Sequence, residues 1–142
     1  MNFLEKAIAV ALEAHEGVLD KSGQPYILHP LHLMMQMETE EAQITAVLHD
    51  VVEDSDMTLE DLAGLGFPAT VIEALALLTH DKESVAYAEY IAGINGNTLA
   101  RQIKLADLEH NMDSRRLPVP LSERDWERLQ KYRVAWEALS EP

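Results

Sequence analysis

In Ile44-Thr45-Ala46-Val47-Leu48-His49-Asp50-Val51-Val52-Glu53-Asp54, an apolar run leads directly into four ionisable side chains. The apolar residues predict a largely buried helix from Glu41 to about Asp54. His49 and Asp50 would lie inside that helix, and a buried carboxylate needs a cation or good hydrogen bonds to offset its desolvation. The run therefore predicts both a helical core and a charged group within it.

The spacing of these four side chains predicts how they are arranged. On a regular helix, His49 and Glu53 share one face, while Asp50 and Asp54 share a second face about 100° away. Four ionisable groups would then crowd two turns of one helix. Such crowding indicates a site that holds a cation or handles protons.

Two other segments supply side chains of the type that bind metals. Asp107 lies in the apolar segment Ile103 to Leu108, and His29 lies between a loop and a helix whose first turn contains Pro30. A single buried His or Asp is more often a hydrogen-bonded structural residue, and that class takes His15, His32 and His110. Two imidazoles and two carboxylates from three segments instead predict a first-row divalent metal site, formed by His29, His49, Asp50 and Asp107.

Helical signals recur along the rest of the chain. Capping-box patterns stand at Asn2 to Glu5, Thr58 to Asp61 and Ser122 to Asp125, and loops are expected at Gly17 to Pro25 and Asp113 to Leu121. No apolar and polar alternation typical of strands is found. The sequence predicts an all-α fold of about seven or eight helices around the metal site. Further helices are expected from about Pro30 to Met37 and at 68–78, 84–94 and 97–112.

The composition limits the possible partners and compartments. The 142 residues fit one domain, 1–142, and the net charge of −14 disfavours a nucleic-acid partner. Local cations or a bound metal can still reverse the potential in one pocket, so a small phosphorylated substrate remains compatible. The chain has no cysteine, no secretion signal at its start and no apolar run of roughly 20 residues, so we expect a cytoplasmic protein without a membrane partner.

The last helix carries an aromatic and aliphatic stripe. Its members are spaced to fall on one side of the helix: Trp126, Leu129, Tyr132, Trp136 and Leu139. Such a stripe either covers the protein's own core, which is the commoner use, or serves a dimer. The oligomeric state therefore stays open.

Four segments stand in the order and spacing of known motifs. They are Ala14-His15-Glu16-Gly17, Lys21-Ser22-Gly23-Gln24-Pro25-Tyr26-Ile27-Leu28-His29-Pro30, Leu48-His49-Asp50-Val51-Val52-Glu53-Asp54 and Lys104-Leu105-Ala106-Asp107-Leu108-Glu109-His110-Asn111-Met112. Together they resemble the hydrolase domain of RelA/SpoT proteins over roughly Leu4 to Leu117, and four collinear motifs are far more specific than one His-Asp pair. No segment resembles the synthetase or regulatory domains of the long family members. The resemblance indicates a small stand-alone hydrolase and no alarmone synthesis.

The resemblance implies an all-α HD fold whose metal, usually Mn²⁺, is held by the same four residues, His29, His49, Asp50 and Asp107. It implies that Glu53 and Asp54 orient or deprotonate the attacking water. It also implies that the substrate's phosphates are contacted by Lys21, Ser22, Asn111 and Ser114. The implied reaction releases pyrophosphate from the 3′ position of (p)ppGpp, an alarmone of the stringent response.

Three positions depart from the family pattern. Asp20 stands where the long hydrolases have an arginine against the guanine base, and Leu108 and Asp113 replace positions that are usually basic. These changes remove stacking and phosphate contacts. The downstream pair Arg115-Arg116 either restores positive charge near the pocket or is merely solvated.

Two alternatives therefore stand beside a (p)ppGpp 3′-pyrophosphohydrolase. One is an HD phosphatase or phosphodiesterase that acts on another small phosphorylated nucleotide, including adenine alarmones. The other is a non-catalytic module that senses nucleotides. The acidic pair Glu53-Asp54 favours an enzyme, because a pure binding site has no need of a buried acidic pair beside the metal.

Overall fold

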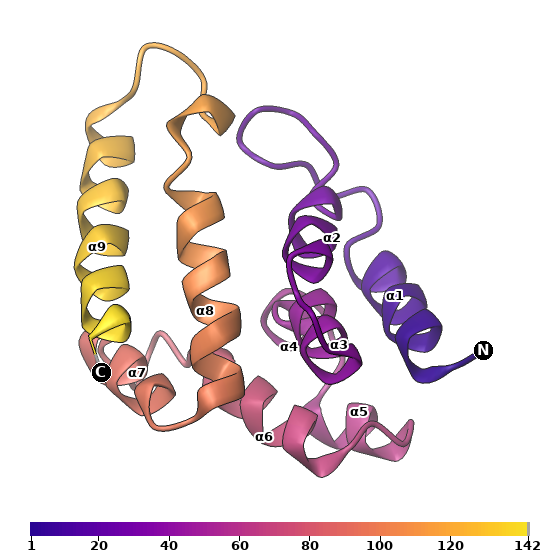
Figure 1. Ribbon diagram of the computed structural model, residues 1–142. Helices are drawn as coiled ribbons and strands as arrows, with labels where there is room; N and C mark the ends of the chain where they lie inside the picture. Colours follow the sequence, from indigo (N-terminus) through magenta and orange to yellow (C-terminus); the bar gives the residue numbers. More distant parts are fainter. Residues whose placement is uncertain (142) are drawn as a thin grey trace.

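The computed structural model describes residues 1–141, and within this range the protein contains α-helices, one short 3₁₀ helix and no β-strand (Figure 1). The expected all-α fold is therefore confirmed. The elements are α1 (Phe3–Ala14), α2 (Leu28–Met35), α3 (Glu40–Leu48), α4 (Val51–Asp54), α5 (Leu59–Gly64), α6 (Ala69–Leu78), α7 (Tyr87–Asn95), α8 (Thr98–Asn111), η1 (Ser114–Arg116) and α9 (Glu123–Ser140).

The helices form two groups that are joined by α3 and α6. Helices α8 and α9 run antiparallel side by side, α1, α2 and α3 lie on the other side, and α5, α6 and α7 close one end (Figure 1). One apolar cluster lies between α2, α7, α8 and α9, and a second lies between α1, α4 and α5. Both α3 and α6 contribute buried residues to both clusters, so they join the two groups of helices.

The longest expected helix is broken in two. The sequence predicts one helix from Glu41 to about Asp54, whereas α3 ends at Leu48 and α4 begins at Val51. At the break, the Nδ1 atom of His49 lies 2.7 Å from the Ala46 carbonyl oxygen, and Asp50 has φ −107° and ψ 1°. Because the backbone leaves the helical region at Asp50, the face assignment derived for a regular helix does not hold here.

The helix starts predicted from capping boxes agree with the structure. Capping boxes at Asn2, Thr58 and Ser122 begin α1, α5 and α9, with Glu5, Asp61 and Asp125 as the reciprocal partners. Helix α7 begins at Tyr87 rather than Ser84, because residues 82–84 form a turn instead. Most of the stripe on α9 packs inward as expected, although Trp126 at its start stays exposed.

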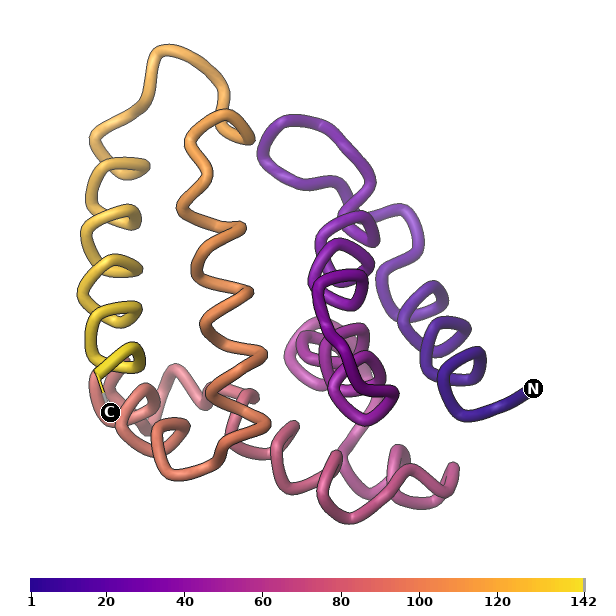
Figure 2. The backbone as a smooth tube through the Cα atoms, viewed as in Figure 1, coloured from indigo at the N-terminus to yellow at the C-terminus, as the bar shows by residue number. Residues whose placement is uncertain are grey.

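The loop between α1 and α2 is shaped by two glycines and by the partly buried carboxylate of Asp20. Gly17 and Gly23 have φ values of 75° and 83°, which favour residues without a Cβ. The Oδ1 atom of Asp20 accepts hydrogen bonds from the backbone N–H groups of Ser22 and Gln24. This loop reaches the end of the molecule where η1 follows α8 (Figure 2).

Within the part of the chain that the structure describes, no helix combines the length and apolar character needed to cross a bilayer.

Candidate metal centre

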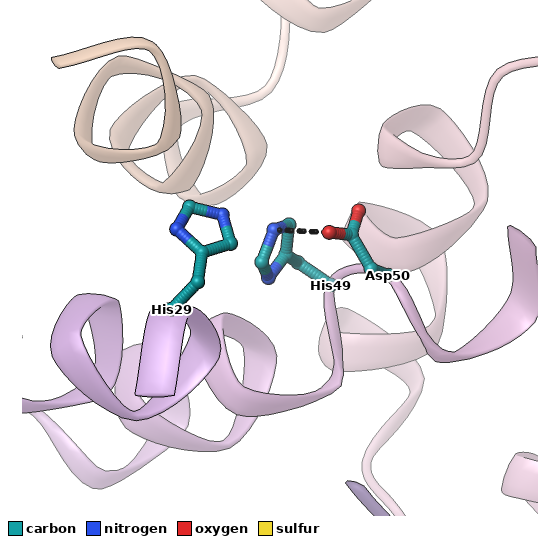
Figure 3. Close-up of side chains that lie close together, drawn as sticks. All are labelled: His29, His49 and Asp50. Atoms are coloured by element: carbon teal, nitrogen blue, oxygen red, sulfur yellow. Dashed lines mark ion pairs between the residues drawn. The ribbon is translucent and has the colours of Figure 1, made fainter. Parts of the chain in front are cut away.

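Four side chains from three places in the fold meet between the two groups of helices. His29 lies on α2, His49 and Asp50 lie at the break between α3 and α4, and Asp107 lies on α8. Ligand atoms of His29, His49 and Asp50 all lie within 4.8 Å of one another (Figure 3). The Oδ1 atom of Asp107 lies 2.9 Å from His29 Nε2 and 3.5 Å from His49 Nε2. The four residues expected to share a site do lie together.

Packing of apolar neighbours holds these polar groups inside. His29 is followed by the buried Pro30, and Asp107 stands between the buried Ala106 and Leu108. The break at His49 follows Leu48, which is fully buried in the core. Desolvated polar groups need partners, so the helices that bury them also force them to face one another.

The histidine at the helix break presents a free nitrogen to two carboxylates. His49 Nδ1–H donates to the Ala46 carbonyl, so Nε2 is the ring nitrogen that a metal ion can bind once it carries no proton. Nε2 is buried and makes no hydrogen bond to residues 1–141, although Asp50 Oδ2 lies only 3.0 Å away. A buried nitrogen lone pair beside carboxylate oxygens is the donor set that a divalent cation completes.

The charges of the site also favour a cation. Burial opposes ionisation of Asp107, but the Lys104 ammonium and the nearby histidines hold its pKa well below the usual range. Burial likewise opposes ionisation of Asp50, and the positive charge of His49 lowers its pKa to about 2. Burial disfavours a charged His49, yet the two carboxylates raise its pKa well above 6.5. The cluster thus attracts one more positive charge, as a proton or as a metal ion.

One hydroxyl group that sequence reasoning missed completes the contacts of Asp50. Tyr26 O–H donates to Asp50 Oδ2 from the end of the loop that precedes α2. Burial and the Asp50 charge raise the pKa of Tyr26, so the phenol stays a donor. Tyr26 lies within the second of the four motif segments, and that position is the only signal that pointed to it.

The sequence predicts a buried acidic pair on α4, whereas Glu53 and Asp54 are both exposed and have different surroundings. Glu53 Oε1 accepts a 2.5 Å hydrogen bond from the His80 backbone N–H, which ties α4 to the segment after α6. Desolvation by its neighbours raises the pKa of Asp54 to about 6, and the charges of Asp50 and Glu53 contribute to the rise. Asp54 is thus the carboxylate whose protonation changes near neutral pH.

A cavity of about 310 Å³ opens beside the cluster. Two predicted phosphate contacts, Lys21 and Asn111, line it, together with Tyr26, Arg116 and Tyr132. Arg116 and Tyr132 were not assigned to the site from the sequence. Only the two adjacent arginines after α8 gave a signal for the first, and only the apolar stripe of α9 gave one for the second.

A second cavity, of about 370 Å³, is lined by residues of the same loop, of α2 and of η1. Ser22 lines it together with His29 and His110. Ser114, the remaining predicted phosphate contact, is exposed at the start of η1 and lines neither cavity. Its role in substrate binding therefore stays a prediction.

The substituted positions have distinct surroundings. Leu108 is fully buried in the core, and exposed Arg115 pairs with Asp113 at 2.9 Å. Arg116 turns inward, and its Nη2 atom lies 3.8 Å from Asp20 Oδ2. Of the two arginines, only Arg116 lines the first cavity, where it faces the carboxylate of Asp20.

Comparisons with known proteins find curated proteins of similar sequence and a solved structure of similar fold. No protein-family model matches the chain. The “Bifunctional (p)ppGpp synthase/hydrolase SpoT” of Escherichia coli (strain K12) is 34% identical over 122 residues, which cover 77% of this chain and 17% of that protein. A “GTP pyrophosphokinase” of Myxococcus xanthus is 29% identical over 128 residues, which cover 79% of this chain and 17% of that protein. The chain thus spans less than a fifth of the length of these curated relatives.

A solved structure has the same fold over nearly the whole chain. It is described as “A metazoan ortholog of SpoT hydrolyzes ppGpp and plays a role in starvation responses”, with a TM-score of 0.82 and 22% identity. The match covers 99% of this chain and 86% of that chain. The collinear motifs, the helical fold and the similarity to SpoT over most of the chain lead to one conclusion: the chain belongs to the RelA/SpoT-type HD-domain family.

Proposed function

We propose that residues 1–142 form a single HD phosphohydrolase domain that removes pyrophosphate from the 3′ position of a (p)ppGpp-like nucleotide, with a divalent metal, Mn²⁺, as its cofactor. The observation that carries this proposal is the convergence of two imidazoles and two carboxylates beside a cavity with a lysine, an arginine and an amide in its wall. The names of the relatives, which include ppGpp hydrolases, support the choice of substrate class.

In this proposal the four clustered residues hold the ion. His29 and His49 give Nε2, and Asp50 and Asp107 give carboxylate oxygens. A bound divalent ion lowers the pKa of water and polarises a phosphoryl oxygen. The two carboxylates also supply the electrostatic attraction for the ion, which takes the place of the proton on His49 Nε2.

The acidic pair manages the proton and its surroundings. Asp54 accepts the proton of the attacking water, because its raised pKa matches neutral pH. Glu53 holds α4 in place through its bond to the His80 backbone and keeps Asp54 directed toward the reaction. This division refines the shared role that the family resemblance implies for the two residues.

The cavity walls bind the phosphates. Lys21 and Arg116 supply charge, Asn111 supplies an amide donor, and Ser22 approaches from the second cavity. Asn111 Nδ2 also donates to Asp107 Oδ1 at 3.0 Å, so this amide links substrate binding to the metal cluster. The strongly acidic surface makes these local cations necessary for an anionic substrate.

The carboxylate of Asp20 favours a second candidate substrate. In place of a guanidinium that stacks on guanine, this chain presents Asp20 bound to its own loop and facing Arg116. Stacking on guanine is then not available from this position. An adenine alarmone or another 3′-pyrophosphorylated nucleotide fits the same chemistry and is the alternative substrate.

Metal analysis and pyrophosphate release test the proposal. Purified protein should bind one divalent ion per chain and release pyrophosphate from at least one of ppGpp, pppGpp and ppApp. Asp50→Ala should lose the ion, whereas Asp54→Asn should keep it and lose about 10²-fold or more in kcat. Asp56→Asn, an exposed acid two residues along, is the matched control and should behave as the parent.

Two outcomes would overturn the proposal. Absence of turnover with all three nucleotides, from protein that is fully loaded with metal, would favour a nucleotide-sensing module. Equal loss of metal in Asp50→Ala and Asp54→Asn would contradict the separation of ligand from base.

A further inference from the structure

A third histidine contacts the candidate metal centre from outside the ligand set. His110 lies on α8, three residues after Asp107, and its Nδ1 atom lies 2.7 Å from Nδ1 of His29. The two rings are parallel within 2°, with centroids 5.0 Å apart. At this distance one nitrogen carries a proton and the other accepts it.

Metal binding at Nε2 of His29 requires one particular tautomer of its ring. His29 Nε2 lies 2.9 Å from Asp107 Oδ1 and belongs to the cluster that fits a divalent ion. A ring nitrogen that binds a metal has no proton, so the proton of His29 must then be on Nδ1. Among residues 1–141, the hydrogen-bond partner for that N–H is His110 Nδ1.

Histidine suits both states of the cluster. Without a metal, His29 Nε2–H donates to Asp107, and His110 Nδ1–H donates to His29 Nδ1. With a metal, His29 Nδ1–H donates to His110 Nδ1, whose proton has moved to its own Nε2. In both states the hydrogen bond between His29 and His110 is kept, which a carbonyl or carboxylate at this position could not provide because neither can donate.

Neighbouring side chains hold His110 in its position beside His29. The ring of His32, one turn after His29 on α2, stacks on His110 with centroids 3.9 Å apart and 16° between planes. Arg116 Nη1 donates to the His110 backbone oxygen at 3.0 Å. Stacking by His32 from α2 and the bond from Arg116 of η1 to the backbone therefore hold His110 beside His29.

We propose that His110 is a positioning residue that accepts the Nδ1 proton of His29 and so keeps His29 Nε2 available for a divalent cation. The sequence alone placed His110 among structural histidines. The inference rests on the proposed metal-dependent function, because it assigns His110 a role toward the metal. Its effect is on metal affinity and is measurable without substrate.

The test compares three variants of the full chain by titration with Mn²⁺, with free Mn²⁺ followed by electron paramagnetic resonance. His110→Phe keeps a ring and removes the acceptor, so its dissociation constant for Mn²⁺ should rise about 10- to 100-fold. His110→Asn keeps an acceptor oxygen and should stay within about threefold of the parent. His32→Phe, the matched control, keeps the stacked ring and should also stay within about threefold. If His110→Phe does not fold, His110→Leu removes the same acceptor.

A spectroscopic readout separates positioning from a merely structural role. In the zinc-loaded protein, the nitrogen-15 spectrum of the histidine rings should show His29 protonated at Nδ1 in the parent and in His110→Asn. Tight Mn²⁺ binding by His110→Phe, or equal weakening in His110→Asn and His110→Phe, would overturn the inference alone. A parent protein that binds no divalent ion would overturn the proposed function together with it.

Discussion

Removal of Lys104 tests how the metal cluster is balanced by charge. Lys104 Nζ lies 2.9 Å from Asp107 Oδ2, and the two side chains are only 13% and 7% exposed. Burial lowers the pKa of Lys104, but the Asp107 carboxylate outweighs it and raises the value well above 10.5. Because the pKa of Lys104 is raised and that of Asp107 is lowered, both are charged at pH 7 and the pair contributes fully there.

The substitution Lys104→Met roughly keeps the length of the side chain and removes its charge. Breaking a buried ion pair from one side costs about 3–5 kcal/mol, because the remaining charge is left uncompensated. Asp107 retains hydrogen bonds from His29 and Asn111, so we expect the free energy of unfolding to fall by about 3 kcal/mol. For 142 residues, with an unfolding entropy of about 2.1 cal/mol/K per residue, this loss lowers Tm by about 10 °C.

The assay is urea unfolding at pH 7, first with a chelator and then with saturating Mn²⁺. A divalent ion supplies the charge that Lys104 no longer provides, so the penalty should shrink when Mn²⁺ is present. Lys82→Met, at an exposed lysine, is the matched control and should change stability by no more than about 0.5 kcal/mol. A loss below about 1 kcal/mol in chelator, or the same loss with and without Mn²⁺, would refute the reasoning.

Three further predictions concern residues around the cluster. Burial lowers the pKa of His15 in the folded protein, so the unfolded chain binds a proton at this residue first as the pH falls. The free energy of unfolding therefore decreases below about pH 6.5. In chemical denaturation, His15→Leu should make the free energy of unfolding depend less on pH between pH 7 and 5. Tyr26→Phe removes the donor to Asp50 and should weaken Mn²⁺ binding about tenfold in calorimetry without changing the circular dichroism spectrum. Arg116→Gln removes the cation opposite Asp20 and should raise KM for the nucleotide about tenfold with a smaller change in kcat, measured by pyrophosphate release.

Local signals in the sequence were sufficient for most of the helices and for the expectation that four polar side chains lie together. Capping boxes such as that at Asn2 are determined by neighbouring residues, so they predict where helices begin without tertiary information. Buried polar residues inside apolar runs, as at His49 and Asp107, indicated the cluster because burial without a partner is costly. Both kinds of signal depend on short stretches of chain.

The features that sequence reasoning missed depend on contacts between distant segments. The break at Asp50 was not predicted, because the apolar run continues through it and only the side-chain bond of His49 to Ala46 marks the interruption. His110 looked like an ordinary structural histidine until α2 and α8 brought it against His29. Arg116 and its neighbour have the same sequence signal, and only the geometry of η1 turns one inward and the other outward.

The two apolar clusters described above meet along α3 and α6, and the candidate ligands come from both sides of that seam. An ion bound there would act as a cross-link between the N-terminal and C-terminal halves of the bundle. Amide protons along α2 and α8 should then exchange more slowly in the loaded protein, as one unit, while those of α5, remote from the seam, keep their rate. Metal loading would thereby make the two halves of the bundle unfold more cooperatively.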